Sequence, residues 1–268
     1  MRDTNILTLA LRLAQRAGAL IREQRRQLDI SFKDGTELVT QADIAADKLI
    51  TEGIRKCYPD HQILSEELNP DQTTEAADLW IIDPIDGTVN YAHRHPQCAV
   101  SIAYYRDGKP VVGVVHNPFL NETFHAIRNK GAFINDRPIR VSRTEEMQRA
   151  LIATGFPYTK ETLPLLMRRL SGVMAECADV RRLGSAALDI CWVATGRLDG
   201  YYESVKPWDF AAARLIASEA GATTGHIFPL ADGVNEDLEG SNLLIANPAL
   251  FERLQQILQA AEAEPAAS

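Results

Sequence analysis

Apolar residues recur at intervals of three and four positions in the first part of the chain, which predicts amphipathic helices. The apolar positions of the first helix are Ile6, Leu9, Ala10, Leu13, Ala17, Leu20 and Ile21. A second helical pattern runs from Ala46 to Cys57, and Pro59 ends it. Residues 31–41, between the two helices, are polar and irregular, so they predict no regular element.

Short apolar runs bounded by turn residues follow, and they predict strands. Two long strands within residues 98–115 are expected to pair through a turn at residues 107–110. The other predicted strands are residues 62–65, 79–83, 123–128, 137–141, 150–155, 180–183, 199–203 and 242–246. Further helices are predicted at residues 163–177, 185–195, 208–220 and 248–261. Hairpins early in the chain and alternating elements later indicate an α+β fold of stacked layers with largely antiparallel sheets.

The sequence shows no clear domain boundary. No repeat of fixed period and no linker rich in Pro or Ser divides it, so residues 1–268 are interpreted as a single domain. A division into halves at residues 1–142 and 143–262 is the alternative. The tail 263–268 is rich in Ala, Glu and Pro and is expected to be disordered.

Composition is typical of a globular protein, with 46% hydrophobic and 24% charged residues. The net charge of −8 argues against direct nucleic-acid binding, which depends on Lys and Arg neutralising phosphates. An acidic protein that acts on a phosphate also needs local positive charge, which favours a bound metal ion. No segment has the apolar length of a membrane span, and the four cysteines show no C-x-x-C spacing. We therefore expect buried, reduced thiols and a cytoplasmic protein.

The segment Asp83-Pro-Ile-Asp86-Gly-Thr88 is the most informative stretch, because an apolar strand leads directly into it. Pro84 bends the chain, so Asp86 is expected to return to the side of Asp83. Two carboxylates held close together repel unless a cation lies between them, and hard oxygen ligands favour Mg²⁺ over zinc. Backbone N–H groups in the following turn can bind phosphate. An isolated Asp-x-x-Asp pair is also typical of a turn whose aspartates only cap backbone groups.

Two further acidic features help to decide between these interpretations. Glu66 and Glu67 follow an apolar strand, and Asp209 stands where a helix is expected to begin. Alone, each feature fits a solvated loop or a helix cap. Because all of them stand beside apolar elements, they indicate one shared acidic cleft.

The same residues carry a resemblance to the inositol monophosphatase family. Asp83-Pro-Ile-Asp86-Gly-Thr88, with Asn90-Tyr91, resembles the first signature of that family. Lys206-Pro-Trp-Asp209-Phe-Ala-Ala is similar to the second signature, and segments 34–43 and 184–189 also match. The resemblance spans nearly the whole chain. It implies a layered αβαβα sandwich of helices and largely antiparallel sheets.

The resemblance implies a site for two or three Mg²⁺ ions. Glu66, Asp83 and the carbonyl of Ile85 would hold one ion. Asp83, Asp86 and Asp209 would hold a second, and Glu66 would help to hold a third, weaker ion. Metals roughly 3.5–4 Å apart neutralise a phosphate ester, lower the pKa of bound water and stabilise the leaving alkoxide. A cysteine or histidine nucleophile is then not required.

The resemblance also implies catalytic and phosphate-binding roles. Thr88 and Asp43 would orient or deprotonate the attacking water, and Glu66 would belong with them to the catalytic residues. The backbone amides of Gly87 and Thr88 would bind the phosphate. Lys33 matches a basic residue near the metal and phosphate region.

Three residues match positions that contact the alcohol part of the substrate, namely Ser185, Ala186 and Glu203, and Asp86 is also implied as a substrate-binding residue. One departure from the family pattern bears on this end of the site. The loop between Glu203 and Asp209 is one residue shorter than is usual in the family. The shorter loop could move Glu203 away from substrate hydroxyls, so we expect a broad substrate range.

These residues together predict Mg²⁺-dependent hydrolysis of a small phosphate monoester, with inositol-1-phosphate as the first candidate. The resemblance implies inhibition by lithium and a homodimer, with no membrane partner expected. The same metal ligands would also serve a fructose-1,6-bisphosphatase, a nucleotide 3′-phosphatase or a histidinol-phosphate phosphatase. A regulatory binding role on the same fold, associated with RNA machinery, is the alternative from a different class.

Overall fold

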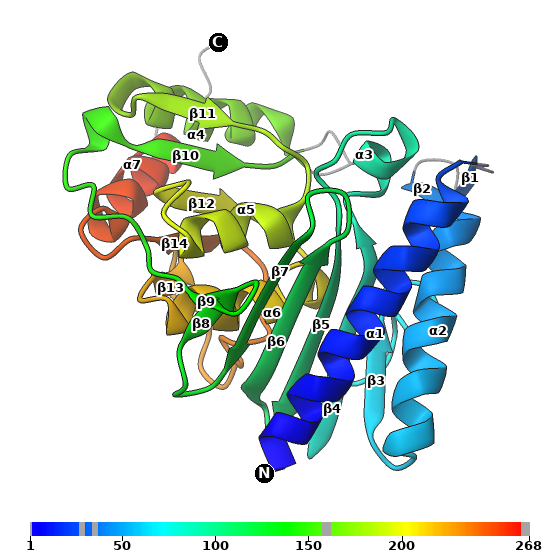
Figure 1. Cartoon of the computed structure of the whole chain (residues 1–268). Coiled ribbons are helices and arrows are strands. Elements are labelled where there is room, and N and C mark those ends of the chain that lie inside the picture. The colour runs from blue at the N-terminus through cyan, green and yellow to red at the C-terminus, as the bar shows by residue number, and fades with distance from the viewer. Residues whose placement is uncertain (1, 27–29, 34–36, 157–161, 264–268) are drawn as a thin grey trace.

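Helices and sheets alternate in five layers in the computed structural model of the chain (Figure 1). The structure describes residues 2–26, 30–33, 37–156 and 162–263, without the side chains of residues 30–33, 37–39 and 263. Helices α1 (Arg2–Gln24) and α2 (Gln41–Cys57) form the first layer, against a seven-stranded sheet. This arrangement confirms the predicted α+β sandwich of helices and largely antiparallel sheets.

The first layer packs through the apolar stripes that the sequence predicts. Ile6 and Leu13 of α1 and Ile50 of α2 are buried against each other and the sheet. Thr40 caps α2, because its hydroxyl accepts a hydrogen bond from the Ala42 N–H at 3.2 Å and its own N–H donates to the Asp43 carboxylate at 2.9 Å. The capping box therefore holds Asp43 in the first turn of α2, facing inward.

The second layer is the seven-stranded sheet, whose order is β3-β4-β5-β6-β7-β8-β9. Its strands are β3 (Gln62–Ser65), β4 (Asp78–Asp86), β5 (Ala99–Arg106), β6 (Lys109–Asn117), β7 (Glu122–Ile127), β8 (Ala132–Ile134) and β9 (Arg137–Pro138). Neighbours are antiparallel except for β3 and β4, which are parallel, with Ser65 beside Ile82. The residues that follow these two positions, Glu66 and Asp83, therefore lie next to each other.

The middle layer consists of α5 (Ala186–Ala194) and α6 (Pro207–Glu219), which lie between the two sheets. Small residues make this close packing feasible. A Cβ atom at Gly113 of β6 would lie 2.5 Å from the carbonyl oxygen of Ala212 in α6. The approach of α6 to the sheet matters for function, because its N-terminus carries Asp209 to the end of β4.

The last two layers are a five-stranded sheet and two outer helices, α4 (Leu163–Glu176) and α7 (Phe251–Ala263). The sheet has the order β11-β10-β12-β14-β13. Its strands are β10 (Leu151–Thr154), β11 (Asp179–Arg181), β12 (Gly200–Glu203), β13 (Thr223–His226) and β14 (Leu243–Ala246). β10 is parallel to β11 and β12, and β14 is antiparallel to β12 and β13.

Several local predictions are wrong. Strands β1 (Ile30–Lys33) and β2 (Glu37–Thr40) pair as a hairpin in the segment predicted to be irregular. Only two residues of the strand predicted at 137–141 pair with β8. Strands β8 and β13 and helix α3 (Thr88–Ala92) lack sequence patterns of their own. Because each is short, its neighbours in the fold rather than its own periodicity determine it.

The cysteines also differ in part from the prediction, because Cys57 is exposed and Cys177 only half-buried. Cys98 and Cys191 are buried, as expected. None of the helices in the described ranges has the length and apolar character that crossing a membrane requires. Most of the tail predicted to be disordered, residues 264–268, lies outside the described residues.

Candidate active site

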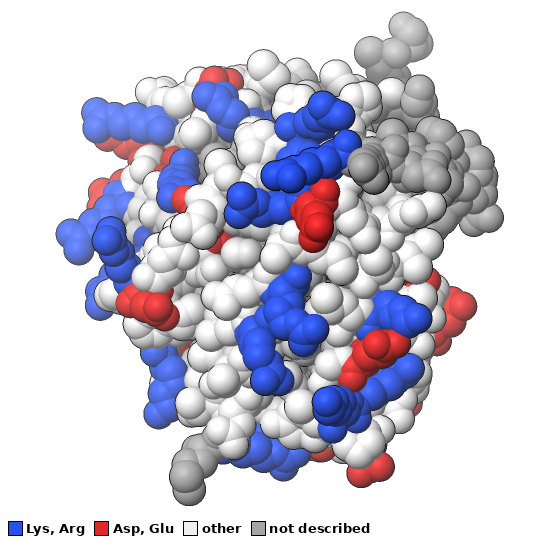
Figure 2. Space-filling model, turned by 45° about the vertical axis from the view of Figure 1, so that its right-hand side comes forward, with Lys and Arg blue, Asp and Glu red and all other residues white. Residues whose placement is uncertain are grey.

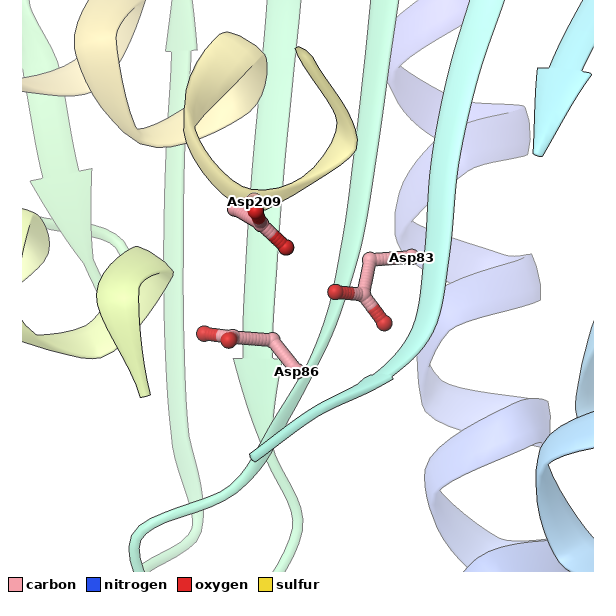
Figure 3. Close-up of side chains that lie close together, drawn as sticks. All are labelled: Asp83, Asp86 and Asp209. Carbon is pink, nitrogen blue, oxygen red and sulfur yellow. The ribbon is translucent and has the colours of Figure 1, made fainter. Parts of the chain in front are cut away.

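The segment that follows β4 begins with a break in its pairing to β5. Asp83 pairs with Ser101 and Asp86 pairs with Ala99, so β4 has one more residue than β5 between these pairs. This β-bulge bends the strand and directs both aspartates into one cavity. Figure 3 shows the two side chains extending from the same side of the strand, the side on which Asp209 lies.

Gly87 continues the turn with a φ of +92°, in the left-handed region that favours glycine. A Cβ atom here would lie 2.9 Å from the carbonyl oxygens of both Gln97 and Gly184. Glycine therefore allows the chain to pass between two backbone segments before α3 begins. Both Gly87 and Thr88 border the cavity.

Asp209 reaches the same cavity from the first turn of α6, where Pro207 opens the helix. Its carboxylate accepts a hydrogen bond from the Lys206 N–H at 2.7 Å. One carboxylate oxygen from each of Asp83, Asp86 and Asp209 lies within 4.8 Å of the other two (Figure 3). Two segments far apart in the sequence thus form one acidic cluster.

Electrostatics make this cluster unfavourable without a cation. Burial raises the pKa of Asp83 well above its usual value, and the charges of Glu66, Asp86 and Asp209 raise it further. Burial raises the pKa of Asp86 to about 6, although hydrogen bonds from Ser185 and the start of α5 oppose the shift. A divalent cation among these oxygens would remove the repulsion, and an all-oxygen set of donors fits Mg²⁺.

Glu66 and Ile85, the other expected metal ligands, border the same cavity, which has a volume of about 780 Å³. The Glu66 N–H donates to the Ile82 carbonyl at 3.2 Å, which continues the pairing of β3 with β4. The Ile85 carbonyl oxygen lies 3.1 Å from Thr88 Oγ1 and is one of two acceptors within reach of the single hydroxyl proton of Thr88. The structure therefore brings all five expected ligands to one place.

Asp43 and Thr88 lie beside the cluster as a hydrogen-bonded pair. Thr88 Oγ1 is 3.2 Å from Asp43 Oδ1, while the other oxygen of Asp43 accepts hydrogen bonds from the N–H and hydroxyl of Thr40. Asp43 is fully buried, and burial raises its pKa despite these hydrogen bonds. Because the hydroxyl proton of Thr88 is directed inward, its lone pairs can accept a hydrogen bond from the cavity.

Ser185 and Ala186 border the cavity and donate hydrogen bonds to Asp86. The Asp86 carboxylate accepts hydrogen bonds from Ser185 Oγ at 2.5 Å, the Ala187 N–H at 2.7 Å and the Ala186 N–H at 3.3 Å. These donors belong to the first turn of α5, where a negative charge is favoured. Asp86 is therefore held in place from the opposite side of the cavity.

Glu203 ends β12 at the far side of the cavity. Its Oε2 atom accepts a hydrogen bond from the Tyr201 hydroxyl at 2.7 Å. Its carboxylate also lies directly against Gly155, where no side chain could be accommodated. Burial raises the pKa of Glu203 to about 7, and the charge of Arg182 partly offsets this shift.

Three further residues contribute to the site without having been assigned a role from the sequence. Asn90 Nδ2 donates to the carbonyls of Gln97 at 2.7 Å and Leu183 at 2.6 Å, and so joins the two segments around Gly87. Asp189 and Arg182 border the cavity. Asp189 lies in segment 184–189, which matches the family. Because it is far in sequence from Asp86 and Glu203, the sequence gives no sign that the three residues line one cavity. Lys33 belongs to β1, and its side chain is outside the described part of the chain.

The layered α+β sandwich and its carboxylate cluster define the class of protein. The chain matches the inositol monophosphatase family over residues 3–263 and belongs to that family. It is similar to the Nus factor SuhB of Pasteurella multocida, with 39% identity over 259 residues that cover 95% of this chain and 96% of the relative.

Solved structures share the fold over nearly the whole chain. The inositol monophosphatase from Anabaena superposes with a TM-score of 0.85 at 34% identity, covering 97% of each chain. A protein described as an IMPase/NADP phosphatase, solved with Mg²⁺ and phosphate, superposes with a TM-score of 0.86 at 25% identity, again covering 97% of each chain.

Proposed function

We propose that this protein hydrolyses a small phosphate monoester in a Mg²⁺-dependent reaction, with inositol-1-phosphate as the first substrate to test. The observation that carries the proposal is the acidic cluster, in which oxygens of Asp83, Asp86 and Asp209 lie within 4.8 Å of one another at the wall of a large cavity. Such a cluster is costly to bury unless a cation is bound there.

Five groups would hold the metal, as two or three ions: the side chains of Glu66, Asp83, Asp86 and Asp209 and the carbonyl of Ile85. Bound Mg²⁺ would supply neutralisation of the ester charge and activation of a water molecule. A phosphate monoester dianion hydrolyses extremely slowly without such help.

The chain's own groups would bind and orient the reactants. The backbone N–H groups of Gly87 and Thr88 would donate to phosphate oxygens at the turn into α3. Thr88 Oγ1 would accept a hydrogen bond from the attacking water while it donates to Asp43, 3.2 Å away. The Thr88–Asp43 pair would thereby orient the water and take up its proton, with Glu66 beside it as a further catalytic carboxylate.

The alcohol part of the substrate would lie toward Ser185, Ala186 and Glu203. The Tyr201 hydroxyl holds the Glu203 carboxylate close to its own strand, which supports a broad substrate range. Fructose-1,6-bisphosphate, a nucleotide 3′-phosphate and histidinol phosphate are the competing substrates. They share the metal end of the site and differ only at the alcohol end.

The decisive experiment is a substrate panel with purified protein, with Mg²⁺ or with excess chelator. We expect turnover of phosphate monoesters with Mg²⁺, none in chelator, and recovery when Mg²⁺ is restored. Because the chain resembles inositol monophosphatases, we also expect lithium to inhibit this turnover. Full activity in chelator would exclude the proposed mechanism, and the ranking of kcat/KM identifies the preferred alcohol.

A second candidate function is a regulatory binding role, because the similar protein from Pasteurella multocida bears the name Nus factor. Figure 2 shows a face on which Lys and Arg side chains predominate despite the net charge of −8. Such a face suits an acidic partner. A variant that has lost turnover but still replaces the wild-type gene in cells would establish the binding role, whereas loss of both would favour the enzyme.

Assembly is part of the proposal, since family resemblance implies a homodimer in which two-fold symmetry is the commonest arrangement. Exposed apolar side chains on α4, among them Met167 and Met174, are suited to such a contact. Sedimentation at micromolar concentration tests it, and a purely monomeric protein would contradict it.

A further inference from the structure

Asp189 is a buried carboxylate that the proposed reaction does not use. It lies in the first half of α5, is 2% exposed, and borders the cavity that Asp86 and Glu203 also line. Its Oδ1 atom is buried without a hydrogen-bond partner among the described residues. Buried polar atoms in native proteins are nearly always hydrogen-bonded, so this atom needs an explanation.

The donors around Asp189 are already engaged elsewhere. The Ser185 hydroxyl and the Ala187 N–H donate to Asp86, and the Tyr201 hydroxyl donates to Glu203. Arg182 also borders the cavity, yet no ion pair joins it to Asp189 in the described structure. The donor that Asp189 lacks can therefore come from the contents of the cavity.

We propose that Asp189 is a specificity-determining residue, which accepts a hydrogen bond from a hydroxyl of the substrate's alcohol part. This inference rests on the proposed phosphatase function and adds a residue to its alcohol end. Asp189 and Glu203 would bind two hydroxyls of a polyol or sugar phosphate whose phosphate lies at the metal cluster.

Other occupants fit Asp189 less well. Among the described residues, the set of three close metal-ligand atoms comprises Asp83, Asp86 and Asp209, without Asp189. An ammonium group would compete with Arg182, whose positive charge already acts on both Asp189 and Glu203. A neutral hydroxyl donates to a carboxylate without displacing Arg182, so a hydroxyl-rich alcohol is the chemistry that fits.

The test is Asp189→Asn, assayed with Mg²⁺ on inositol-1-phosphate and on phenyl phosphate, which has no hydroxyl on its ring. A carboxylate accepts a hydrogen bond about twice as strongly as a neutral amide. We expect kcat/KM for inositol-1-phosphate to fall about tenfold, mainly through KM, while the value for phenyl phosphate changes less than about twofold. Free inositol should also inhibit the variant less than it inhibits the wild type.

Asp199→Asn is the matched control, because Asp199 is a buried carboxylate outside the cavity. It accepts hydrogen bonds from Ser142 Oγ at 2.6 Å and the Leu151 N–H at 2.7 Å. This variant should lose thermal stability and leave the ratio of the two kcat/KM values unchanged. Asp189→Asn should keep its stability, since no donor within the described structure depends on its charge.

The outcomes separate this inference from the function on which it rests. An equal fall for both substrates in Asp189→Asn would make Asp189 a structural residue of α5 and overturn the inference. An unchanged ratio, or a selective loss for histidinol phosphate with its ammonium group, would also overturn it. Absence of turnover in the wild type would overturn the proposed function and this inference with it. Turnover of phenyl phosphate by both the wild type and Asp189→Asn would support the proposed function, whatever the result for inositol-1-phosphate.

Discussion

The two ends of the cavity are built differently. At the cluster end, Asp86 accepts hydrogen bonds from Ser185, Ala186 and Ala187, and the Asp43 carboxylate is held by Thr40 and Thr88. At the alcohol end, Glu203 accepts a hydrogen bond from Tyr201, and Asp189 Oδ1 has no partner among the described residues.

This difference indicates which part of the reaction each end serves. Protein donors fix the positions of the carboxylates at the cluster end, as metal binding requires, because ligand geometry must be maintained before the ion arrives. Under the proposed function, the carboxylates at the alcohol end would leave hydrogen bonds for the substrate to complete. The cluster end therefore suits one reaction, the hydrolysis of the phosphate ester, whereas the alcohol end would accept different alcohols.

The largest effect is expected from Asp83→Asn at the cluster end. The substitution removes a charge that would stabilise the metal, so kcat at saturating Mg²⁺ should fall about a hundredfold or more. The metal-free variant should be at least as stable as the wild type, because Glu66, Asp86 and Asp209 repel the original carboxylate. Thermal unfolding with and without Mg²⁺ measures both, and the stabilisation by Mg²⁺ should largely disappear.

Asp86→Asn is the matched variant, with the same loss of charge in a different set of hydrogen bonds. Its turnover should fall to a similar extent. Its metal-free form should lose about 1–3 kcal/mol of stability, because an amide has only one accepting oxygen. If that oxygen accepts from Ser185 and Ala187, the NH₂ group faces the Ala186 N–H, which is left without an acceptor. Equal stabilities of metal-free Asp83→Asn and Asp86→Asn would contradict the expected difference, in which Asp83 is mainly repelled by its neighbours and Asp86 is stabilised by hydrogen bonds.

A smaller effect that reaches both ends is expected from Asn90→Ala. Asn90 Nδ2 joins the turn at Gly87 to the carbonyls of Gln97, Leu183 and Gly184, just before α5. Its loss leaves these carbonyls without their donor and should cost about 1–3 kcal/mol in urea unfolding. Turnover should fall for both inositol-1-phosphate and phenyl phosphate. A fall in turnover for only one of the two substrates would mean that Asn90 stabilises only one end of the cavity.

Glu203→Gln should have a more limited effect, confined to the alcohol end. The Tyr201 hydroxyl holds the carboxylate close to its own strand, so its contact with substrate contributes modestly. We expect kcat/KM for inositol-1-phosphate to change about tenfold or less, and the value for phenyl phosphate to stay constant. A thousandfold preference for one inositol phosphate, lost in the variant, would show that the short loop still positions Glu203 well.

The smallest effect concerns the pH dependence of stability. Burial raises the pKa of Glu203 from 4.5 to about 7, so between these pH values the folded protein holds a proton that the unfolded chain has lost. The wild type should therefore lose stability relative to Glu203→Gln as the pH rises from 4.5 to 7. We expect a change of about 1 kcal/mol, reduced by the solvent in the cavity. Denaturant unfolding in chelator measures it, and a constant difference would contradict the raised pKa.

Much of the fold could be predicted because its elements are long or strongly periodic. The apolar stripe of α1 and the boundaries of β3 follow directly from the sequence. β13 and the hairpin of β1 and β2 could not be predicted, because strands this short are stabilised by their neighbours and carry little periodicity.

Within the site, the sequence by itself determined the chemistry of the cluster end. Asp83, Asp86, Gly87 and Thr88 lie in one short segment, where local backbone geometry brings the side chains together. At the other end, the resemblance already implied Ser185, Ala186 and Glu203, and tertiary structure alone decided the place of Asp189. Asp189 reaches the cavity because α5 lies between the two sheets, and its missing partner is a consequence of which donors Asp86 and Glu203 have already taken. Competition for hydrogen-bond donors depends on three-dimensional distances, which spacing along a chain does not encode.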